Sequence, residues 1–575
     1  MLKTATQVVV QQQTVYQGPD RAICHHRPQT IARRLAHLLL FPRFDLVHPY
    51  HLRWVRPRGL GLVAGSGPTL SYSTLEHFLS DLEALRVAAP LGDALAQRYL
   101  EIWPAPAEGA FFYLDNHRKV RYSGHTTAAG KISASDRILG GTTQLFLHDA
   151  AGHGLHMHSG PADDHMTQTL RPFVQHFRDL VGRERVRGIV ADQEMRSVVL
   201  FLALELIDDL RFVTIGRTPT PAQEAAFELE GLFVPYLRNP ESGEPSHWVA
   251  HAHTLLQDRQ QGASFQAEVA LVVDCRAGMP GRLIPVLHNL REAEVPVELP
   301  HQLYVGHWQG QERVFRDMRP YQNLDAHYGQ KKVAAPNRPQ IRKREALGRK
   351  LLALGKQVTT AQHKVQEHSE ALEALAQKAQ QQQVETQAEV ATLRQAGRES
   401  TSPKQRERLL IRAERLAAQG QVQQVRLQQR QRRLVVEQRD WQQKLAERQN
   451  ERQEIIRILQ EAEARPFYDF DLEKDDLMTY LRMAGENAHR FVQERYFAGT
   501  SLEKVDEATM VRLVYNQPGW VRRQGQSLHV QLQGYGDPDL QAAVVLACQR
   551  VNEAQVELVS GHGLRMEVAS EVLDW

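Results

Sequence analysis

The sequence predicts an α/β protein whose mixed sheet is interrupted by a β-rich insertion and accompanied by helical regions. Three observations favour this fold class. Residues 109–216 contain strand-like apolar runs followed by a helix, a strand, a second helix and a last strand, an order typical of a mixed sheet. Residues 217–300 alternate short β-prone runs with turns, and residues 340–464 have the composition of long helices. The expected regions are a helical N-terminal region (1–105), the first part of an α/β core (106–216), the insertion (217–300), the last helix of the core (301–338), a coiled-coil-like helical hairpin (339–464) and an α+β C-terminal region (465–575).

Residues 1–105 are predicted to be mainly helical. In STLEHFLSDLEAL, which begins at Ser73, apolar residues three and four positions apart form one face, and the stretch near residue 25 is basic and helix-prone. Plain packing helices and a small DNA-binding region both fit this pattern. No secure helix-turn-helix spacing is present that would favour DNA binding.

The expected core begins with four strand-like runs, AFFYLD, KVRYSG, TTQLFLHD and HGLHMHSG, of which the last two predict a hairpin. The helix MTQTLRPFVQHFRDLVG separates them from the strand RGIVAD, and the helix SVVLFLALELIDDL leads to the strand RFVTIG. After the insertion, HWQGQERVFRDMRPYQNLDAHYG predicts a helix that resumes the core.

Residues 340–464 predict two long helices that pair antiparallel, with the turn-forming segment GRESTSP between them. In the second helix, apolar residues recur in steps of three and four, although Gly420, Gln423 and Arg430 interrupt the seam. The members of the seam are Leu409, Ala413, Leu416, Leu427, Leu434, Trp441, Leu445, Ile455 and Leu459.

Charge is unevenly divided along the chain. The 575 residues carry 70 Lys and Arg against 67 Asp and Glu, a formal net charge of +3. Residues 340–464 alone carry 24 Lys and Arg against 16 Asp and Glu, so the remainder is slightly acidic. The near-neutral total therefore does not exclude a polyanionic partner. The basic hairpin is either a solvated spacer or a clamp that contacts a polyanion.

Three acidic residues form the candidate catalytic and metal-binding set. Asp115 and Asp192 end two predicted core strands, and neighbouring parallel strands bring their carboxyl ends to one edge of a sheet. Glu312 lies on the helix that follows the insertion. Carboxylates suit Mg²⁺ or Mn²⁺, and two such ions can promote displacement at a phosphodiester. A single Asp at a strand end is more often a cap or turn residue, so the ordered set carries the prediction.

The segments around these acids resemble the catalytic motifs of the DDE transposases of bacterial insertion sequences. The matching segments are FFYLDNHRKVRYSG, VADQEMRS and HWQGQERVFRDMRPYQNLDAHYG, and the likeness extends from about residue 55 onward. It implies an RNase H-like catalytic domain with a β-rich insertion, in which Asp115, Asp192 and Glu312 are the catalytic residues and metal ligands. It also implies two Mg²⁺ or Mn²⁺ ions as cofactors, double-stranded DNA at transposon ends and at the target as substrate, and a homodimer.

Side chains near the acids are the candidates for holding the DNA. They are His117, Arg118, Lys119, Arg196, Trp308, Arg313, Arg316 and Arg319. Four positions depart from the family pattern. Asn116 stands where glycine is usual and Gln193 where arginine is common, and Trp308 and Arg319 stand near Glu312 where many relatives carry arginine and lysine. Trp308 either stacks on a displaced base or packs in the core. Glu194 is either a partner of the metal site or an acid favoured at a helix N-terminus.

Other interpretations remain open. His148, His153, His156, His158 and His165 form a dense group, but a zinc site would need a third, rigidly held ligand. A catalytically inactive, domesticated relative would bind DNA without cutting it, and a coiled-coil scaffold would leave the acids unexplained. The sequence contains neither a GxxxxGK[ST] phosphate loop nor GxSxG, which argues against nucleotide hydrolysis and a serine hydrolase.

The compartment is predicted from cysteine usage and hydropathy. Cys24, Cys275 and Cys548 are widely separated, which excludes a disulfide framework and a CxxC-type metal site. No stretch of about 18 apolar residues is present. We therefore expect a soluble cytoplasmic protein associated with the nucleoid.

Overall fold

The computed structural model describes most of the chain as two compact units. The described residues are 1–16, 25–55, 59–65, 67–132, 136–219, 224, 227–239, 242–258, 260–275, 282–290, 295–401, 403–461 and 465–570, without the side chains of residues 307–314, 316 and 317. One unit comprises residues 1–334 and 468–575, and the other comprises residues 335–467.

The N-terminal region consists of helices. They are α1 (Leu2–Val15), α2 (Pro28–Leu40), α3 (Gly59–Val63), α4 (Tyr72–Ala84) and α5 (Ala88–Ile102), with 3₁₀ turns at η1 (Phe41–Phe44) and η2 (Pro49–Trp54). The Ser71 hydroxyl begins α4 by accepting a hydrogen bond from the Thr74 N–H at 3.2 Å. Phe78 of this helix is buried in one continuous cluster with Phe112 and Leu477, which lie in later elements. The region therefore shares its hydrophobic core with the rest of the first unit.

A mixed sheet follows, as the sequence predicts. Its first strands are β1 (Ala110–Val120), β2 (Ala129–Ile132), β3 (Arg137–His148), β4 (Gly154–Pro161), β5 (Val186–Ala191) and β6 (Arg211–Ile215). β3 pairs antiparallel with β1, β2 and β4, whereas β1, β5 and β6 are parallel. The prediction of separate strands at 110–115 and 119–124 is wrong, because β1 continues without a turn to Val120. The polar second half of β1 remains part of the sheet because its side chains have buried partners.

The β-rich insertion continues the same sheet. Its strands are β7 (Glu228–Leu229), β8 (Val234–Arg238), β9 (Pro245–Asp258), β10 (Ala263–Asp274) and β11 (Arg282–His288). β11 pairs antiparallel with β6 through Val286 and Ile215, and the sheet reaches eleven strands. The insertion therefore covers the edge that β6 would otherwise expose.

Helices cover both faces of the core strands. On one face lies α6 (Met166–Val181), whose Phe177 ring meets the Phe112 ring edge-on at a centroid distance of 5.3 Å. On the other face lies α9 (Leu299–Tyr321), whose Tyr304 is buried with Tyr113 and Val190. The helix after β5 is α7 (Val198–Leu202), which continues as a π-helical turn over Ala203–Ile207. Since side chains alternate along β1, Phe112 and Tyr113 point to opposite faces.

Buried charge ties the second half of β1 to α12 (Glu473–Tyr496). The Lys119 ammonium lies 3.1 Å from the Asp475 carboxylate, and the Arg121 guanidinium lies 2.9 Å from the same oxygen. These three side chains are at most 3% exposed. Burial lowers the pKa of Lys119, whereas Lys119 and Arg121 outweigh the effect of burial on Asp475 and lower its pKa to about 2. Such a group is stable only while every charge keeps its partner.

The C-terminal region is a small α+β layer. It contains α13 (Glu507–Met510), β14 (Gly519–Gln524), β15 (Ser527–Leu532), α14 (Pro538–Glu553) and β16 (Gly563–Val568). β14 and β15 form an antiparallel hairpin, and β16 joins β15 in parallel after α14. Val544 and Cys548 of α14 pack with Phe497 and Met510 in a separate cluster. The short strands β12 (Lys332–Ala334) and β13 (Tyr468–Phe470) pair antiparallel with each other.

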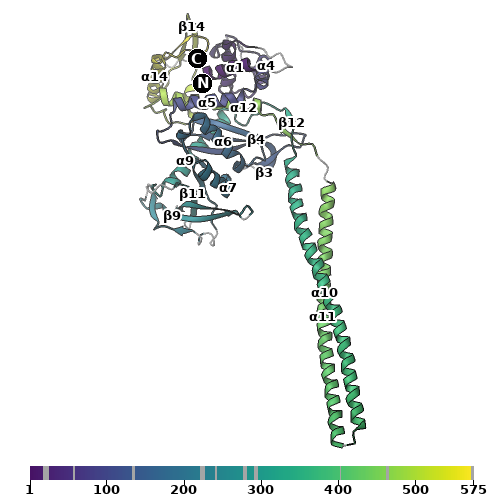
Figure 1. Ribbon diagram of the computed structural model, residues 1–575. Helices are drawn as coiled ribbons and strands as arrows, with labels where there is room; N and C mark the ends of the chain where they lie inside the picture. The colour runs from purple at the N-terminus through teal and green to yellow at the C-terminus, as the bar shows by residue number, and fades with distance from the viewer. Residues whose placement is uncertain are drawn as a thin grey trace. The chain divides into compact units, whose positions relative to one another are not determined.

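The second unit is the expected helical hairpin. α10 (Arg338–Glu399) and α11 (Pro403–Glu461) run antiparallel and side by side along their length (Figure 1). Ala413 and Ile455 of the predicted seam are buried, and its other members are half-buried, as a two-helix contact allows. Within the described part of the chain, no helix combines the length and the apolar character needed to cross a membrane.

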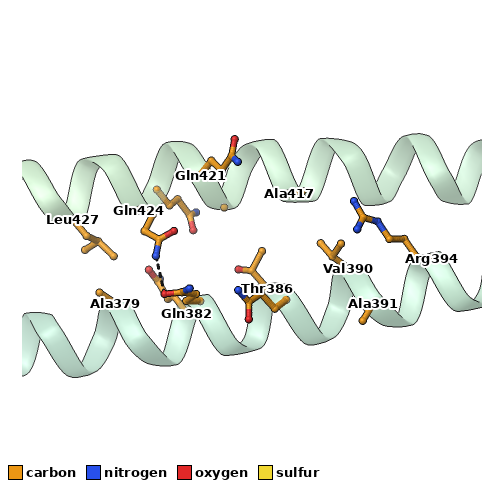
Figure 2. Close-up of a pocket in the computed structure, with 14 residues that line it drawn as sticks. Ala379, Gln382, Thr386, Val390, Ala391, Arg394, Ala417, Gln421, Gln424 and Leu427 are labelled. Carbon is orange, nitrogen blue, oxygen red and sulfur yellow. Dashed lines mark hydrogen bonds between the residues drawn. The ribbon is translucent and has the colours of Figure 1, made fainter.

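The middle of the hairpin is polar where the predicted seam is interrupted. Figure 2 shows a pocket between the two helices, lined largely by glutamine, alanine and other small or polar residues. There Gln424 donates a hydrogen bond to the Gln383 side chain at 2.9 Å. A Cβ atom at Gly420 would lie 2.7 Å from a methyl carbon of Thr386, so the missing side chain permits the close approach of the helices.

We expect Asp475→Ala to lower the free energy of unfolding by about 3–5 kcal/mol, because it leaves Lys119 and Arg121 buried without their carboxylate. Urea denaturation followed by tryptophan fluorescence measures the change. Glu101→Ala is the matched control, since it breaks the exposed Arg98–Glu101 pair and should cost less than about 1 kcal/mol. Equal losses in the two variants would contradict a structural role for the buried group.

Candidate active site

The structure places two predicted catalytic acids on neighbouring parallel strands. Asp115 lies within β1, and Asp192 directly follows β5. The register pairs Leu114 with Ala191, so the two aspartates occupy the next pair of positions. Both are partly exposed. The two carboxylates therefore lie at one place on the sheet, at the carboxyl end of β5. The prediction that Asp115 ends its strand is wrong, because β1 continues to Val120.

Both acids are on the face of the sheet that α9 covers. Tyr113 and Val190 precede them by two residues and pack against Tyr304 of α9, and side chains two residues apart in a strand share a face. The Tyr304 hydroxyl donates a hydrogen bond to Asp192 at 3.4 Å. This contact fixes the Asp192 carboxylate relative to the helix.

The third predicted acid, Glu312, belongs to α9 between two residues that touch this face. Tyr304 contacts Asp192, and the Phe315 ring stacks on the His117 ring at a centroid distance of 5.5 Å. The side chains of Glu312, Trp308, Arg313 and Arg316 lie outside the described residues.

Electrostatics set Asp115 apart from an ordinary surface carboxylate. Burial raises the pKa of Asp115 to about 7, and the negative charges of Asp192 and Glu194 act in the same direction. A hydrogen bond from the Asn116 N–H and the positive charge of Arg319 oppose the increase. Neighbouring carboxylates that repel one another form a donor set suited to a hard divalent cation, which would relieve the repulsion.

Glu194 is a further acid of the site. Its carboxylate accepts a hydrogen bond from the Asn116 amide at 2.7 Å and lies 3.5 Å from the Arg118 guanidinium. These contacts link the turn after β5 to β1, so Glu194 is a partner of the site and does more than begin a helix. Asn116, which departs from the family pattern, supplies the bond that glycine could not make.

Arg319 is a described cation whose charge lowers the pKa of Asp115. Its guanidinium donates to His117 Nδ1 at 3.4 Å, and His117 Nε2–H then donates to Asp325 at 2.8 Å. Half of the Arg319 side chain is exposed, whereas only 3% of the His117 side chain is exposed. His117 therefore orients Arg319 and Asp325 from below the surface, and the prediction that it contacts DNA directly is corrected.

The other predicted basic residues differ in accessibility. Lys119 is fully buried against Asp475, so its predicted contact with DNA is also corrected. Arg118 is largely buried and donates to the Lys131 carbonyl at 2.7 Å, beside Glu194. Arg196 lines an open pocket together with Glu194 and Arg217, next to the end of β5. Arg118 and Arg196 thus lie near Glu194, and Arg319 acts on Asp115.

Sequence reasoning missed two residues of the site, Tyr304 and Asp325. Tyr304 lies in an unremarkable apolar stretch, LPHQLYVGH, at the start of α9. Asp325 lies in NLDAHYG, and its acidic side chain is the signal that could identify it. The sequence positions of Tyr304 and Asp325 do not indicate that Tyr304 contacts Asp192 or that Asp325 contacts His117.

We expect Asp115→Asn to stabilise the metal-free protein more at pH 8 than at pH 5. The unfolded carboxyl ionises near its usual pKa of 3.8 and the folded one near 7, so stability falls as the pH rises between these values. Asparagine does not ionise, so the gain in the free energy of unfolding should be larger by about 2–3 kcal/mol at pH 8 than at pH 5. Urea denaturation in a chelating buffer measures it. Asp179→Asn, at an exposed position of α6, should show no such dependence.

Comparisons with known proteins give the site no family name. No protein-family model matches this sequence, and no curated protein matches it. The chemistry of the site therefore rests on the arrangement of Asp115, Asp192 and their neighbours.

Proposed function

We propose that this protein is a DDE-type DNA transposase that cuts DNA at transposon ends and joins the freed 3′-hydroxyl to target DNA. The observation that carries the proposal is the pair formed by Asp115 and Asp192 on parallel strands, facing the helix that contains Glu312. The order of strands and helices around this pair supports the RNase H-like fold that the resemblance implies.

The residues present fit two Mg²⁺ or Mn²⁺ ions. Asp115 and Asp192 would hold them, with Glu312 as the proposed third ligand. Bound there, the ions would supply charge stabilisation for an in-line attack of an oxygen on phosphorus, in both cleavage and joining. The raised pKa of Asp115 also leaves this carboxyl able to exchange a proton near neutral pH.

The remaining side chains have supporting roles. Tyr304 holds the Asp192 carboxylate in place by its hydrogen bond. Arg319 presents a planar guanidinium, fixed by His117 and Asp325, that suits a phosphate oxygen of the scissile strand. Arg196 would contact the DNA backbone on the other side of Asp192. We further propose a homodimer, in which each copy serves one transposon end.

We expect Asp115→Asn and Asp192→Asn to lower strand cleavage by at least about a hundredfold while leaving DNA affinity within a few-fold. The substrate is duplex DNA taken from both flanks of the gene, with Mg²⁺ or Mn²⁺, and products are resolved on denaturing gels. Glu312→Gln should behave in the same way. Asp179→Asn is the control of matched chemistry on the opposite face and should cut normally.

Cleavage that survives Asp115→Asn would contradict the proposal. If the parent protein binds the flanking DNA but never cuts it with either ion, the alternative of an inactive, DNA-binding relative is favoured. Inverted repeats at both flanks, bounded by a short duplication, would support an active element.

The basic hairpin is proposed as a second DNA-contacting surface. Its excess of positive charge is spread over exposed arginines, and four of them fall within fourteen residues of α11: Arg426, Arg432, Arg433 and Arg439. Contact with a phosphate costs an arginine on a solvated helix little free energy. Each contact releases counterions bound to the DNA.

We expect replacement of these four arginines by glutamine to weaken DNA binding and flatten its salt dependence. The slope of log affinity against log salt should fall by about 0.9 for every arginine that contacts a phosphate. Fluorescence anisotropy at several salt concentrations measures this slope. The four Arg→Lys replacements keep the charge and serve as the control. An unchanged slope in the glutamine variant would leave the hairpin a spacer.

A further inference from the structure

A cluster of metal-ligating side chains lies away from the candidate active site. Asp93 of α5, His156 of β4 and His176 of α6 converge on one point, with ligand atoms that all lie within 4.8 Å of one another. One Asp93 oxygen lies 2.9 Å from His156 Nε2 and 2.7 Å from His176 Nε2. Helix α6 and strand β4 therefore present their histidines to the same carboxylate.

From these contacts we propose that Asp93, His156 and His176 form a zinc site that fastens α5 to β4 and α6. Two imidazole nitrogens and one carboxylate oxygen are a donor set that Zn²⁺ takes in proteins, with a water as the fourth ligand. The proposal is independent of the function proposed above.

The second nitrogen of His156 has partners that hold the ring. His156 Nδ1 lies 2.8 Å from the Met157 N–H and 3.0 Å from the Met157 carbonyl oxygen, so either tautomer of the ring finds a partner. The Tyr480 hydroxyl lies 3.2 Å from the same nitrogen and donates to the Met157 carbonyl at 2.9 Å. These bonds fix the plane of the ring and aim Nε2 at Asp93.

The surroundings give the site one closed side and one open side. Only 6% of the His156 side chain is exposed, against 32% of Asp93 and 53% of His176. The rings of Phe173 and Phe177 pack against His156 edge-on. An ion can therefore enter beside His176 and be shielded by aromatic rings on the inner side.

The charge state of Asp93 also suits a cation. Burial alone would raise the pKa of Asp93, but the hydrogen bonds from His156 and His176 outweigh burial and leave the pKa below its usual value. A divalent ion in place of the shared protons would keep this attraction and make it stronger.

The zinc site that the dense histidine group suggested takes a different form. Of that group only His156 belongs to the cluster. His153 is bound between Asp149 and Glu494, and His165 caps α6 through Thr167. The missing ligands come from Asp93 and His176, which are distant from His156 in the sequence and meet it only through packing.

The test is zinc binding by the full-length protein, in wild type and in His176→Gln. The wild type should retain Zn²⁺ at this site after dialysis, and His176→Gln should bind that ion at least about a hundredfold more weakly in a competition titration with a chromogenic chelator. His176 is half exposed, so the substitution leaves the core intact. His158→Gln, at an exposed position of β4, the strand of His156, is the control and should bind Zn²⁺ like the wild type.

Two further measurements separate this site from the carboxylates of the active site. Asp115→Asn should lose no Zn²⁺ here, and Zn²⁺ should raise the melting temperature of wild type and of Asp115→Asn but not of His176→Gln. Equal zinc affinity and equal thermal shifts in wild type and His176→Gln would overturn the proposal. A wild type that binds no Zn²⁺ would overturn it as well and leave a hydrogen-bonded Asp–His group.

Discussion

The parallel pairing of β1 with β5 is the constraint on which the candidate active site depends. It aligns Asp115 with Asp192, and the alternation of side chains turns both toward α9, because Tyr113 and Val190 are anchored on that helix by Tyr304. A slip of the pairing by one residue would separate the carboxylates and move an apolar anchor to the wrong face. The packing that stabilises the sheet therefore also sets the geometry of the acids.

This arrangement has an energetic cost that other parts of the unit offset. A half-buried carboxylate beside two others disfavours its own ionisation, which the raised pKa of Asp115 records. The cost is local, whereas the hydrophobic cluster runs without a break from the N-terminal helices through the sheet to α12. The insertion adds strands to the edge at β6, so β6 is held by β5 on one side and by β11 on the other. A rigid sheet can carry a strained set of charges that a loop could not hold in place.

The sequence predicts the elements well and the partners of polar residues poorly. Apolar runs locate the strands, and the spacing of apolar residues locates the hairpin. Asp192 lies at a strand end as predicted, whereas β1 continues beyond Asp115. Alternation along β1 puts His117 and Lys119 on the face of Asp115. What covers that face is decided by α9 and α12, which come much later in the chain, and Asp475 of α12 makes Lys119 an interior residue. The meeting of Asp93, His156 and His176 is hidden for the same reason, because tertiary packing leaves no mark in local spacing.

Arg319 shows how the site can be stable with and without cations. Burial and two neighbouring acids raise the pKa of Asp115, while the guanidinium of Arg319 lowers it, so that the carboxyl titrates near neutral pH. Without a divalent ion, a proton can therefore occupy Asp115 at little cost, and the fold does not have to carry a bare buried charge. A divalent ion held by Asp115 and Asp192 would favour the charged carboxylate, in the same direction as Arg319. The half-exposed guanidinium of Arg319 would then be available to a phosphate of the proposed substrate.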